Sequence, residues 1–494
     1  MPEESLVNAK NGFTVLVAET ALHSRYDPVS EAEKYIDSLR LTPYNCFILL
    51  EPGLDYLSAV IKKKYPRARI ISLHCSSFFD RENFLLKNNA GNFSEECSSS
   101  WNPASGKTLE DFLELTLQDA DAADIKLIDW KPSVSIYGKS CLDLASRTVE
   151  CIRRISAGRK TAANFGRRWI KNALHNLEFL QNTVTALPGS RQILVCAAGP
   201  GLEDSMDEIA GFNKNAGRPF IISVSSAGPA LVHKGIMPDI IITSDGGSWA
   251  RYHLTECLRQ CQKLFYKTPV FASALTAILP SQIQNYPVLV IRDGSLWQDL
   301  LLKTAGVFSL AFPQRGTVSI TALDLAFYLS PENVYISGFD FAHRDIVTHA
   351  RPYAFEYILE QKQNRKEPFY SLVYKREEMI RTSGSHGIYA SWFTSHLSSF
   401  PDRLYSLGKS GYGVPQGKPF LDKKGKDARL TTENKKNTAG KKSLIDVIVK
   451  AIDNPGTGKQ IGKELKELLL PEMPVEDHNF TNELKRTLWE LADG

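Results

Sequence analysis

Three apolar runs in the middle of the chain end in small or polar residues whose types suit phosphate binding. The run ILVC is followed by two alanines and Gly199-Pro200-Gly201, and the next two runs end near Ser225 and Asp245. Closely spaced glycines let a backbone approach a phosphate, and the free N–H groups of a following helix attract an anion. The pattern therefore indicates an anion site, although the same residues also suit a plain strand-to-helix turn.

The glycine turn is not the dinucleotide-binding fingerprint. The third small residue of that motif would stand at position 204, where the chain has Asp204. The charges of Glu203 and Asp204 suit the first turn of a helix and would oppose a pyrophosphate lying directly against it. Both interpretations of the turn, ligand site and simple connection, stay open at this point.

Two further motifs carry polar groups that could contact a ligand. Asp245, in SDGG, could hydrogen-bond a ribose, hold a metal or only form the turn. Metal binding is the weaker functional interpretation because position 247 carries no second acid. Thr317 and Ser319 stand at the start of an apolar-periodic helix, where a hydroxyl can cap the helix and an anion can lie against free N–H groups.

Histidines provide the candidates for a general base. The segment SGFDFAHRDIVTHARPYAFE holds Asp340, His343 and His349 in a loop with Tyr353, and His386 follows in RTSGSHGIY. An imidazole titrates near neutral pH and is the usual general base. A surface histidine without a function is nevertheless the commoner case, and residue chemistry alone does not choose among the three.

The elements that must position these residues are strands of a parallel sheet. From Gln192 the chain gives six apolar strand candidates, several of them separated by helical stretches: QILVCA, PFIISVS, PDIIITS, PVFAS, PVLVIRD and NVYISGF. This alternation predicts an α/β fold with a doubly wound sheet, which binds ligands beyond the carboxyl ends of its strands. The polar residues described above stand at those ends.

A second α/β region precedes this one. TVLVAE, CFILLE and ARIISLHC alternate with amphipathic runs, which predicts a βαβαβ unit, and residues 142–180 read as helical. We expect five parts: a Rossmann-like domain (1–135), a helical connector (136–188), a catalytic domain (189–417), a basic linker (418–442) and a C-terminal helical segment (443–494).

Composition narrows the class of protein. A chain of 494 residues with 43% apolar residues can bury more than one core. Residues 422–442 carry a net charge of +5, and the rest of the chain carries −1. Nucleic-acid binding would therefore depend on this one segment, which has no aromatic residues to stack on bases. We interpret the segment as a solvated linker. The eight cysteines form no CxxC pair, and we expect buried thiols without zinc or disulfides. With neither a signal peptide nor a membrane span recognised, the expected location is the cytoplasm.

The order of the motifs resembles a known family. AAGPGL, VSSAGPALVHKGIMPDIIITSD, RGTVSITALDLAFYL and SGFDFAHRDIVTHA look like the motility accessory factor (Maf) flagellin glycosyltransferases. The central domain of that family is similar to the MptE-like 6-hydroxymethylpterin diphosphokinases. The likeness, which includes LHSRYDPVSEAEKYI near the N-terminus, covers most of residues 14–417.

The resemblance implies a cytoplasmic, inverting glycosyltransferase with a sialyltransferase-like, GT-A-like central domain. Such an enzyme moves a nonulosonic (sialic-acid-like) sugar from a CMP donor to Ser/Thr hydroxyls of flagellin or another protein acceptor, without a metal or other cofactor. By the same resemblance Tyr353 stabilises the leaving phosphate and a histidine is the base, with His349 ranked narrowly before His386. The residues implied to bind the nucleotide are Gly199, Pro200, Gly201, Ser225, Asp245, Thr317, Ser319 and Asp340.

Two departures from the family keep alternatives open. The first is Gly201, which stands where the family usually has serine. The second is EPGLDYL (51–57), which replaces a glycine-rich turn, so we expect the first domain to be an acceptor-binding or structural module. One alternative is transfer of diphosphate from ATP to a hydroxymethylpterin, with Mg²⁺ held by Asp245 and either Asp340 or Asp293. The other is a non-catalytic nucleotide-binding scaffold.

Overall fold

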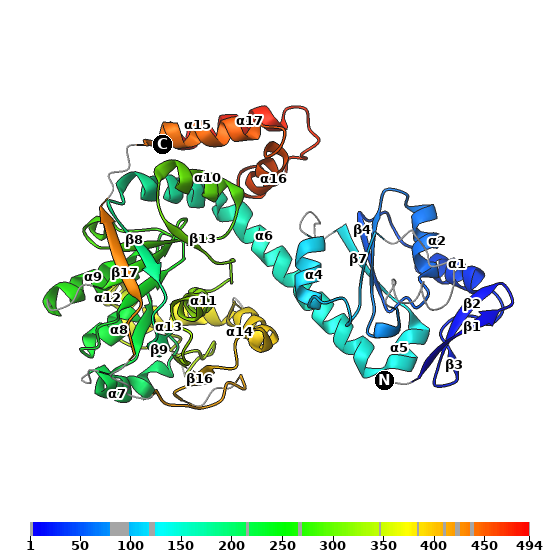
Figure 1. Ribbon diagram of the computed structural model, residues 1–494, viewed down its shortest axis with the longest axis horizontal. Coiled ribbons are helices and arrows are strands. Elements are labelled where there is room, and N and C mark those ends of the chain that lie inside the picture. The colour runs from blue at the N-terminus through cyan, green and yellow to red at the C-terminus, as the bar shows by residue number, and fades with distance from the viewer. Residues whose placement is uncertain are drawn as a thin grey trace. The chain divides into compact units, whose positions relative to one another are not determined.

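The computed structural model divides the chain into two compact units, Met1–Lys160 and Thr161–Gly494 (Figure 1). It describes residues 3–79, 98–117, 124–213, 217–264, 269–344, 347–382, 385–408, 412–419, 425–434 and 439–493. The helix α6 (Lys139–Phe179) begins in the first unit and ends in the second, in agreement with the helical pattern of residues 142–180. The finer division into five parts stays a prediction.

The first unit contains a four-stranded parallel sheet. Its strand order is β6 (Ser99–Trp101), β5 (Arg69–Leu73), β4 (Cys46–Leu50) and β7 (Ile125–Asp129). All five residues of β4 are buried, which explains why this strand reads as an unbroken apolar run. The helices of this unit before α6 are α1 (Pro28–Ser38), α2 (Tyr56–Lys64), α4 (Leu109–Thr116) and α5 (Lys131–Tyr137).

The run TVLVAE does not belong to this parallel sheet, contrary to the sequence-based expectation. It falls in β2 (Gly12–Val17), which pairs antiparallel with β1 (Glu4–Ala9) and β3 (Thr20–Ala21) in a separate sheet. The physical reason is a tight hairpin: Ala9 pairs with Gly12 across a two-residue loop, and Gly12 has a φ of +120°, a conformation that suits glycine.

The second unit is built on a ten-stranded sheet, with β17 antiparallel to β8 at one edge and the other pairs parallel. The six strands expected from the sequence are β9 (Ile193–Cys196), β10 (Phe220–Val224), β11 (Ile240–Thr243), β12 (Val270–Ala274), β13 (Val288–Arg292) and β15 (Val334–Ser337). They all run parallel, which confirms an α/β protein. The others are β8 (Asn182–Leu187), β14 (Ser309–Ala311), β16 (Leu404–Ser406) and β17 (Arg429–Asn434).

The strand order changes direction at β9. From β9 the chain moves one strand at a time to β13, and β15 then returns to the other side of β9. Such a reversal opens a crevice at the carboxyl ends of the strands. The helices that follow the strands are α7 (Leu202–Asn213), α8 (Gly228–His233), α9 (Arg251–Leu264), α10 (Leu296–Ala305) and α11 (Val318–Leu329), of which α11 packs against β9, β10 and β11.

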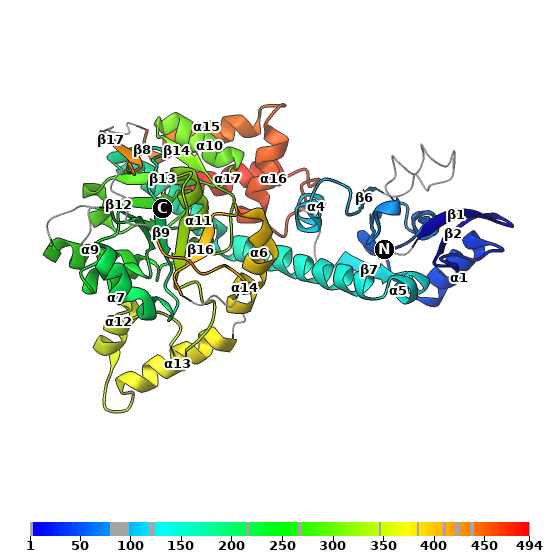
Figure 2. The same cartoon turned by 60° about the horizontal axis from the view of Figure 1, so that its bottom comes forward.

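Three helices lie between β15 and β16: α12 (Ala354–Lys362), α13 (Phe369–Thr382) and α14 (Ser385–His396). Figure 2 shows α12 and α13 projecting from the sheet of the second unit. The C-terminal helices α15 (Lys441–Ile452), α16 (Gly458–Leu469) and α17 (Phe480–Asp493) pack as a group, and α10 contacts α15 and α16. Their fully buried Leu444, Leu465 and Leu484 join the core of the second unit.

The structure bears on two other expectations from the sequence, one for residues 429–434 and one for the cysteines. Residues 429–434, expected in a solvated linker, form β17, an edge strand that pairs with β8 along its whole length. The cysteines of the described part whose side chains are placed are buried free thiols, as expected; Cys97 and the side chain of Cys261 lie outside the described residues. Within the described ranges, no helix is both long enough and apolar enough to cross a membrane.

Candidate functional site

The glycine turn after β9 is covered by the loop that follows β15. The backbone N–H of Gly201 donates to Asp340 Oδ2 at 2.8 Å, and that of Gly199 donates to the carbonyl of Gly338 at 2.9 Å. A Cβ built on either Gly199 or Gly201 would overlap the Asp340 carboxylate. The two glycines are therefore required by the close approach of Asp340, which explains why serine is absent from position 201.

The start of α7 is engaged by the same loop. The N–H groups of Leu202 and Glu203 donate to carbonyls of the turn itself, at 3.0 and 3.2 Å. Arg344 forms a bidentate ion pair with Asp204, and the Glu203 carboxylate accepts the N–H of Arg351 at 2.8 Å. A phosphate at the Gly201 N–H would have to displace Asp340, so nucleotide binding by Gly199, Pro200, Gly201 and Asp340 stays a prediction.

Asp245 follows β11 and lies exposed at the carboxyl edge of the sheet. Its Oδ1 accepts the N–H of Gly247 at 2.7 Å, the geometry of a turn-forming aspartate. The surrounding protein partly shields the Asp245 carboxyl from water, which raises its pKa. The hydrogen bond from Gly247 and the charge of Arg168 on α6 oppose this shift. The side chain is thus available to a ligand and has one nearby cation.

Tyr389 on α14 lies near both Asp245 and the start of α11. Burial together with the charge of Asp245 raises the pKa of the Tyr389 phenol, and a Cβ at Gly316 would lie 3.9 Å from the Tyr389 ring. Thr317 is the N-cap residue of α11, yet its side chain makes no capping hydrogen bond, and Ser319 is buried in the first turn. Asp245, Thr317 and Tyr389 therefore surround one region in which a helix N-terminus is uncapped.

Two histidines lie next to this region. The rings of His343 and His386 have centroids 4.9 Å apart, and the buried Nδ1 atom of each has no hydrogen-bond partner among the described residues. His386 precedes Tyr389 by three positions on α14, so both side chains lie on one face of that helix. Burial and the neighbouring charge of His343 lower the pKa of His386, which keeps its imidazole neutral at physiological pH.

His349 and Tyr353 form a separate aromatic group. Their rings stack at 4.3 Å, Nδ1 of His349 lies 2.7 Å from the Thr348 hydroxyl, and His253 of α9 packs 5.2 Å from the Tyr353 ring. Ser225 is buried at the end of β10, where its carbonyl accepts a hydrogen bond from Cys257 Sγ at 3.6 Å. The structure thus pairs His349 with Tyr353 and pairs His386 with His343.

Two of the three carboxylates proposed for a metal already have hydrogen-bond partners in turns of the protein. Asp293 accepts hydrogen bonds from the N–H of Ser295 at 2.9 Å and from Gln314 at 2.8 Å, and Asp340 is bonded to Gly201. Within the described ranges, no three His, Cys, Asp or Glu side chains are grouped in a way that could hold a metal ion.

The space around the turn after β4 in the first unit is filled by protein side chains. The fully buried Glu51 accepts the N–H of Cys75 at 2.5 Å and lies 3.1 Å from His74 Nδ1. His23 Nε2 accepts the N–H of Leu54 at 2.9 Å, and burial lowers the pKa of His23 to about 3, which keeps it a neutral acceptor. These groups occupy the place where a glycine-rich turn would leave room for a phosphate.

Two residues of the site escaped the sequence-based selection, Arg168 and Tyr389. His343 was among the histidine candidates, but its pairing with His386 was not foreseen. Tyr389 could have been found, because it follows His386 at helical spacing. Arg168 could not, since nothing local indicates that α6 passes near Asp245.

Comparison with known proteins agrees with this architecture. Residues 167–345 match the family described as 6-hydroxymethylpterin diphosphokinase MptE-like, so the second unit contains an MptE-like domain, which spans β9 to β15. Along its full length the chain is similar in fold to the MAf glycosyltransferase from Magnetospirillum magneticum AMB-1, with a TM-score of 0.53 and 12% sequence identity. That match covers 100% of this chain and 87% of the other. The resemblance inferred from the sequence is thereby confirmed.

Two relatives are uncharacterized proteins of Treponema pallidum (strain Nichols). One is 27% identical over 249 residues, which are 50% of this chain and 53% of that protein. The other is 22% identical over 360 residues, 70% of this chain and 60% of that protein. The chain therefore spans between a half and two thirds of the length of these relatives.

Proposed function

We propose that the protein is a glycosyltransferase that moves a CMP-activated nonulosonic sugar onto Ser/Thr hydroxyls of a protein acceptor. The acceptor that we propose to test first is flagellin. The observation that carries the proposal is the fold similarity to the MAf glycosyltransferase over the whole chain. The uncapped start of α11, which lies near Asp245 and a pair of half-buried histidines, supports it. The same proposal includes a GT-A-like fold and an inverting mechanism that uses no metal.

In this mechanism a histidine removes the proton of the acceptor hydroxyl. The hydroxyl oxygen bonds to the anomeric carbon while the bond from that carbon to the phosphate oxygen breaks, and CMP leaves with the electron pair. The N-terminal amides of α11 and the Thr317 hydroxyl would stabilise the departing phosphate, and Asp245 would hold the ribose. No proton has to come from a metal-bound water.

We assign the base to His386 in preference to His349. The lowered pKa of His386 and its unpartnered Nδ1 fit a group that accepts a proton at neutral pH, and Tyr389 links it to Asp245. His349 has the Thr348 hydroxyl at its Nδ1 and stacks on Tyr353, the tyrosine that the resemblance assigns to the leaving phosphate. His349 with Tyr353 is the rival pair.

The test is a transfer assay with a CMP-nonulosonic sugar and flagellin, comparing His386→Gln and His349→Gln. Loss of a general base slows transfer by about 10²–10⁴-fold, so we expect that loss in His386→Gln and a smaller one in His349→Gln. His478→Gln is the matched control, because His478 is exposed at the C-terminal end of the chain, before α17. Full activity of both site variants would refute a histidine base.

A second function is favoured by the MptE-like family match: diphosphate transfer from ATP to a hydroxymethylpterin. That chemistry needs Mg²⁺ held by carboxylates, and here Asp340 and Asp293 are each engaged in separate turns. Thermal shifts with CMP and with ATP, each with and without Mg²⁺, separate the two. Stabilisation by CMP alone, lost in Asp245→Ala, supports glycosyl transfer; stabilisation only by ATP with Mg²⁺, abolished by EDTA, supports diphosphate transfer. No stabilisation by any of the nucleotides would favour a non-catalytic scaffold protein that binds no nucleotide.

A further inference from the structure

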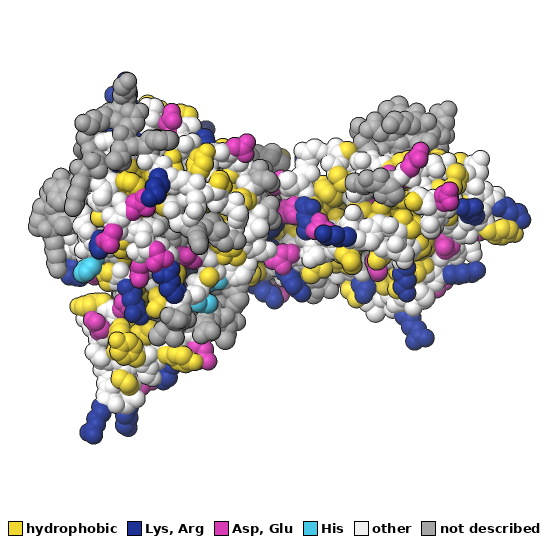
Figure 3. Space-filling view, turned by 90° about the horizontal axis from the view of Figure 1, so that it is seen from below, with side chains coloured by type: hydrophobic (Ala, Val, Ile, Leu, Met, Phe, Trp, Pro, Cys, Tyr) yellow, Lys and Arg dark blue, Asp and Glu magenta, His cyan; other side chains and the backbone are white. Residues whose placement is uncertain are grey.

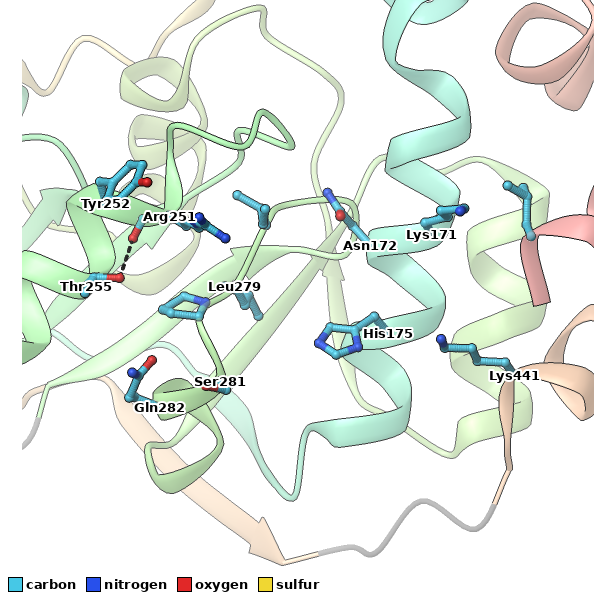
Figure 4. Close-up of a pocket in the computed structure, with 13 residues that line it drawn as sticks. Lys171, Asn172, His175, Arg251, Tyr252, Thr255, Leu279, Ser281, Gln282 and Lys441 are labelled. Atoms are coloured by element: carbon cyan, nitrogen blue, oxygen red, sulfur yellow. Dashed lines mark hydrogen bonds between the residues drawn. The ribbon is translucent and has the colours of Figure 1, made fainter. Parts of the chain in front are cut away.

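A pocket of about 580 Å³ in the second unit is lined by none of the candidate catalytic or nucleotide-binding residues selected from the sequence. It lies between α6, the start of α9, the segment after β12 and the C-terminal helices (Figure 4). Its volume is within the range of pockets that hold small molecules. Its lining comes from five separate parts of the chain, so only the fold brings these residues together.

The pocket is strongly basic. Lys171 and His175 project from α6, Arg251 begins α9, and Lys441 begins α15. Among the described residues, no aspartate or glutamate lines the pocket, and none forms an ion pair with any of these four side chains. On the face seen in Figure 3, by contrast, basic and acidic side chains are interspersed.

The backbone adds to the positive potential. Both α9 and α15 start at the pocket. In α9 the N–H groups of Tyr252 and His253 already donate to the carbonyls of Trp249 and Ala250, whereas Gly440, the N-cap residue of α15, offers no side-chain cap. The N-terminus of a helix carries a partial positive charge and free N–H groups, which favour an anion. Figure 4 shows the side chains of Arg251 and His175 directed from opposite sides toward the space between α9 and α6.

The rest of the lining suits a ligand larger than an ion. Ile278, Leu279 and Leu491 supply apolar surface, while Asn172, Ser281 and Gln282 supply polar groups. The Tyr252 ring lies next to Arg251, with the guanidinium 5.2 Å from its centroid. A phosphate would be held by the basic side chains, and a sugar or base could contact the remaining walls.

We propose that this pocket binds a small phosphate ester, a mononucleotide or a sugar phosphate, at a site separate from the region around Asp245. Two hydrogen bonds connect the pocket lining with the segment that carries Asp245. The N–H of Ile278 donates to the Asp245 carbonyl at 3.1 Å, and Asn172 donates to the Gly246 carbonyl at 3.2 Å. A ligand in the pocket would therefore influence the conformation of the segment that carries Asp245.

The test is calorimetric titration of the full chain with glucose 1-phosphate and with inorganic pyrophosphate at fixed ionic strength. Removal of a charged hydrogen-bond partner weakens binding by roughly 10-fold, so Arg251→Gln/Lys441→Gln should lose about 100-fold. Lys366→Gln/Lys459→Gln is the matched control, because it removes two exposed positive charges outside the pocket. Thr255→Trp keeps every charge and fills the pocket, so it should also abolish binding.

Asp245→Ala separates this proposal from the catalytic one, since it alters the proposed donor site and leaves the lining of the pocket intact. We expect Asp245→Ala to bind both probes as the unaltered chain does. Equal binding by the Arg251→Gln/Lys441→Gln variant would overturn the proposal, as would the absence of binding up to roughly 10 mM ligand. Binding of pyrophosphate without glucose 1-phosphate would mean an adventitious anion site only, and would overturn it too.

Discussion

At the scale of single residues, the identity of position 201 follows from a contact 139 residues away. The Asp340 carboxylate accepts the Gly201 N–H and fills the space that a Cβ would need. We therefore predict that Gly201→Ser destabilises the second unit by about 1–3 kcal/mol, the usual cost of an added atom in a packed site. The measurement is the thermal unfolding midpoint, which should fall by several degrees.

The control for this prediction lies on the same helix. Gly211 of α7 has nothing within 4 Å of a built Cβ, so Gly211→Ser should leave the midpoint unchanged or raise it slightly. Asp340→Ala removes the obstructing carboxylate, and the double variant Gly201→Ser/Asp340→Ala should lose less stability than the two single changes together. Strict additivity would mean that Asp340 is not what excludes a side chain from position 201.

The paired histidines predict a defined pH dependence. Burial first, and then the charge of His343, lowers the pKa of His386 below its usual value. A base with a lowered pKa stays unprotonated to lower pH, so the acidic limb of the kcat/KM profile should have its midpoint below about 6.5.

Replacing the neighbour should move that limb in a known direction. Because the charge of His343 is one cause of the low pKa, His343→Gln should raise the pKa of His386 and shift the acidic limb to higher pH. His478→Gln should leave the profile unchanged. A shift to lower pH, or no shift, would contradict the assignment of His386 as the titrating base.

Residue chemistry identified the glycine turn, Asp245 and the histidines, but not which of them meet. The turn resembled a phosphate loop because glycine allows close approach; here the approaching group is the protein's own Asp340. Pairing of His343 with His386 depends on how α14 packs beside the loop after β15, and no local pattern encodes that packing. Sequence reasoning therefore gave the residue types and left their partners open.

At the scale of elements, buried parallel strands were the most predictable feature. β9, β10 and β11 are buried at every position, so each reads as an apolar run. β14 and β16 have three residues each, and β17 is a polar edge strand, RLTTEN, in a basic segment. These elements form because a neighbouring strand offers hydrogen-bond partners, which a sequence window does not reveal.

The helix α6 fixes the loops at the carboxyl edge through buried amides. Asn176, 1% exposed, donates its Nδ2 hydrogens to the carbonyls of Leu275 and Ala277, both at 2.9 Å. Asn176→Leu would leave both carbonyls without a partner inside the protein, at a cost of about 2–4 kcal/mol. We predict a marked fall in the thermal midpoint and, because the loop after β12 also lines the basic pocket, weaker binding of phosphate esters.

An amide on the same helix gives the comparison. Asn172 also donates to a carbonyl of this loop, that of Thr276 at 2.9 Å, but it is only partly buried, so water can replace it. Asn172→Leu should therefore cost clearly less than Asn176→Leu. Equal effects would mean that burial does not set the cost of losing these hydrogen bonds.

At the scale of the whole molecule, the proposed chemistry and the basic pocket both belong to one unit. The candidate site residues, from Arg168 to Tyr389, and the complete pocket lining lie within Thr161–Gly494. The part of α6 that follows residue 160 contributes the fully buried Ile170, Leu174 and Leu177 to the core of this unit. We therefore propose that the second unit folds and binds its ligands without the first.

We predict that a fragment of residues 161–494 folds and binds CMP and pyrophosphate as the full chain does, and that it fails to glycosylate flagellin. The loss of transfer is expected because we propose that the first unit binds the acceptor. Glu51 and His23 fill the space beside the turn after β4, where a nucleotide phosphate would otherwise lie. Circular dichroism, calorimetry and the transfer assay measure the three properties. A fragment of residues 181–494, without α6, should not fold, since it lacks Ile170, Leu174 and Leu177. A folded 161–494 fragment that no longer bound either ligand would show that the first unit takes part in ligand binding.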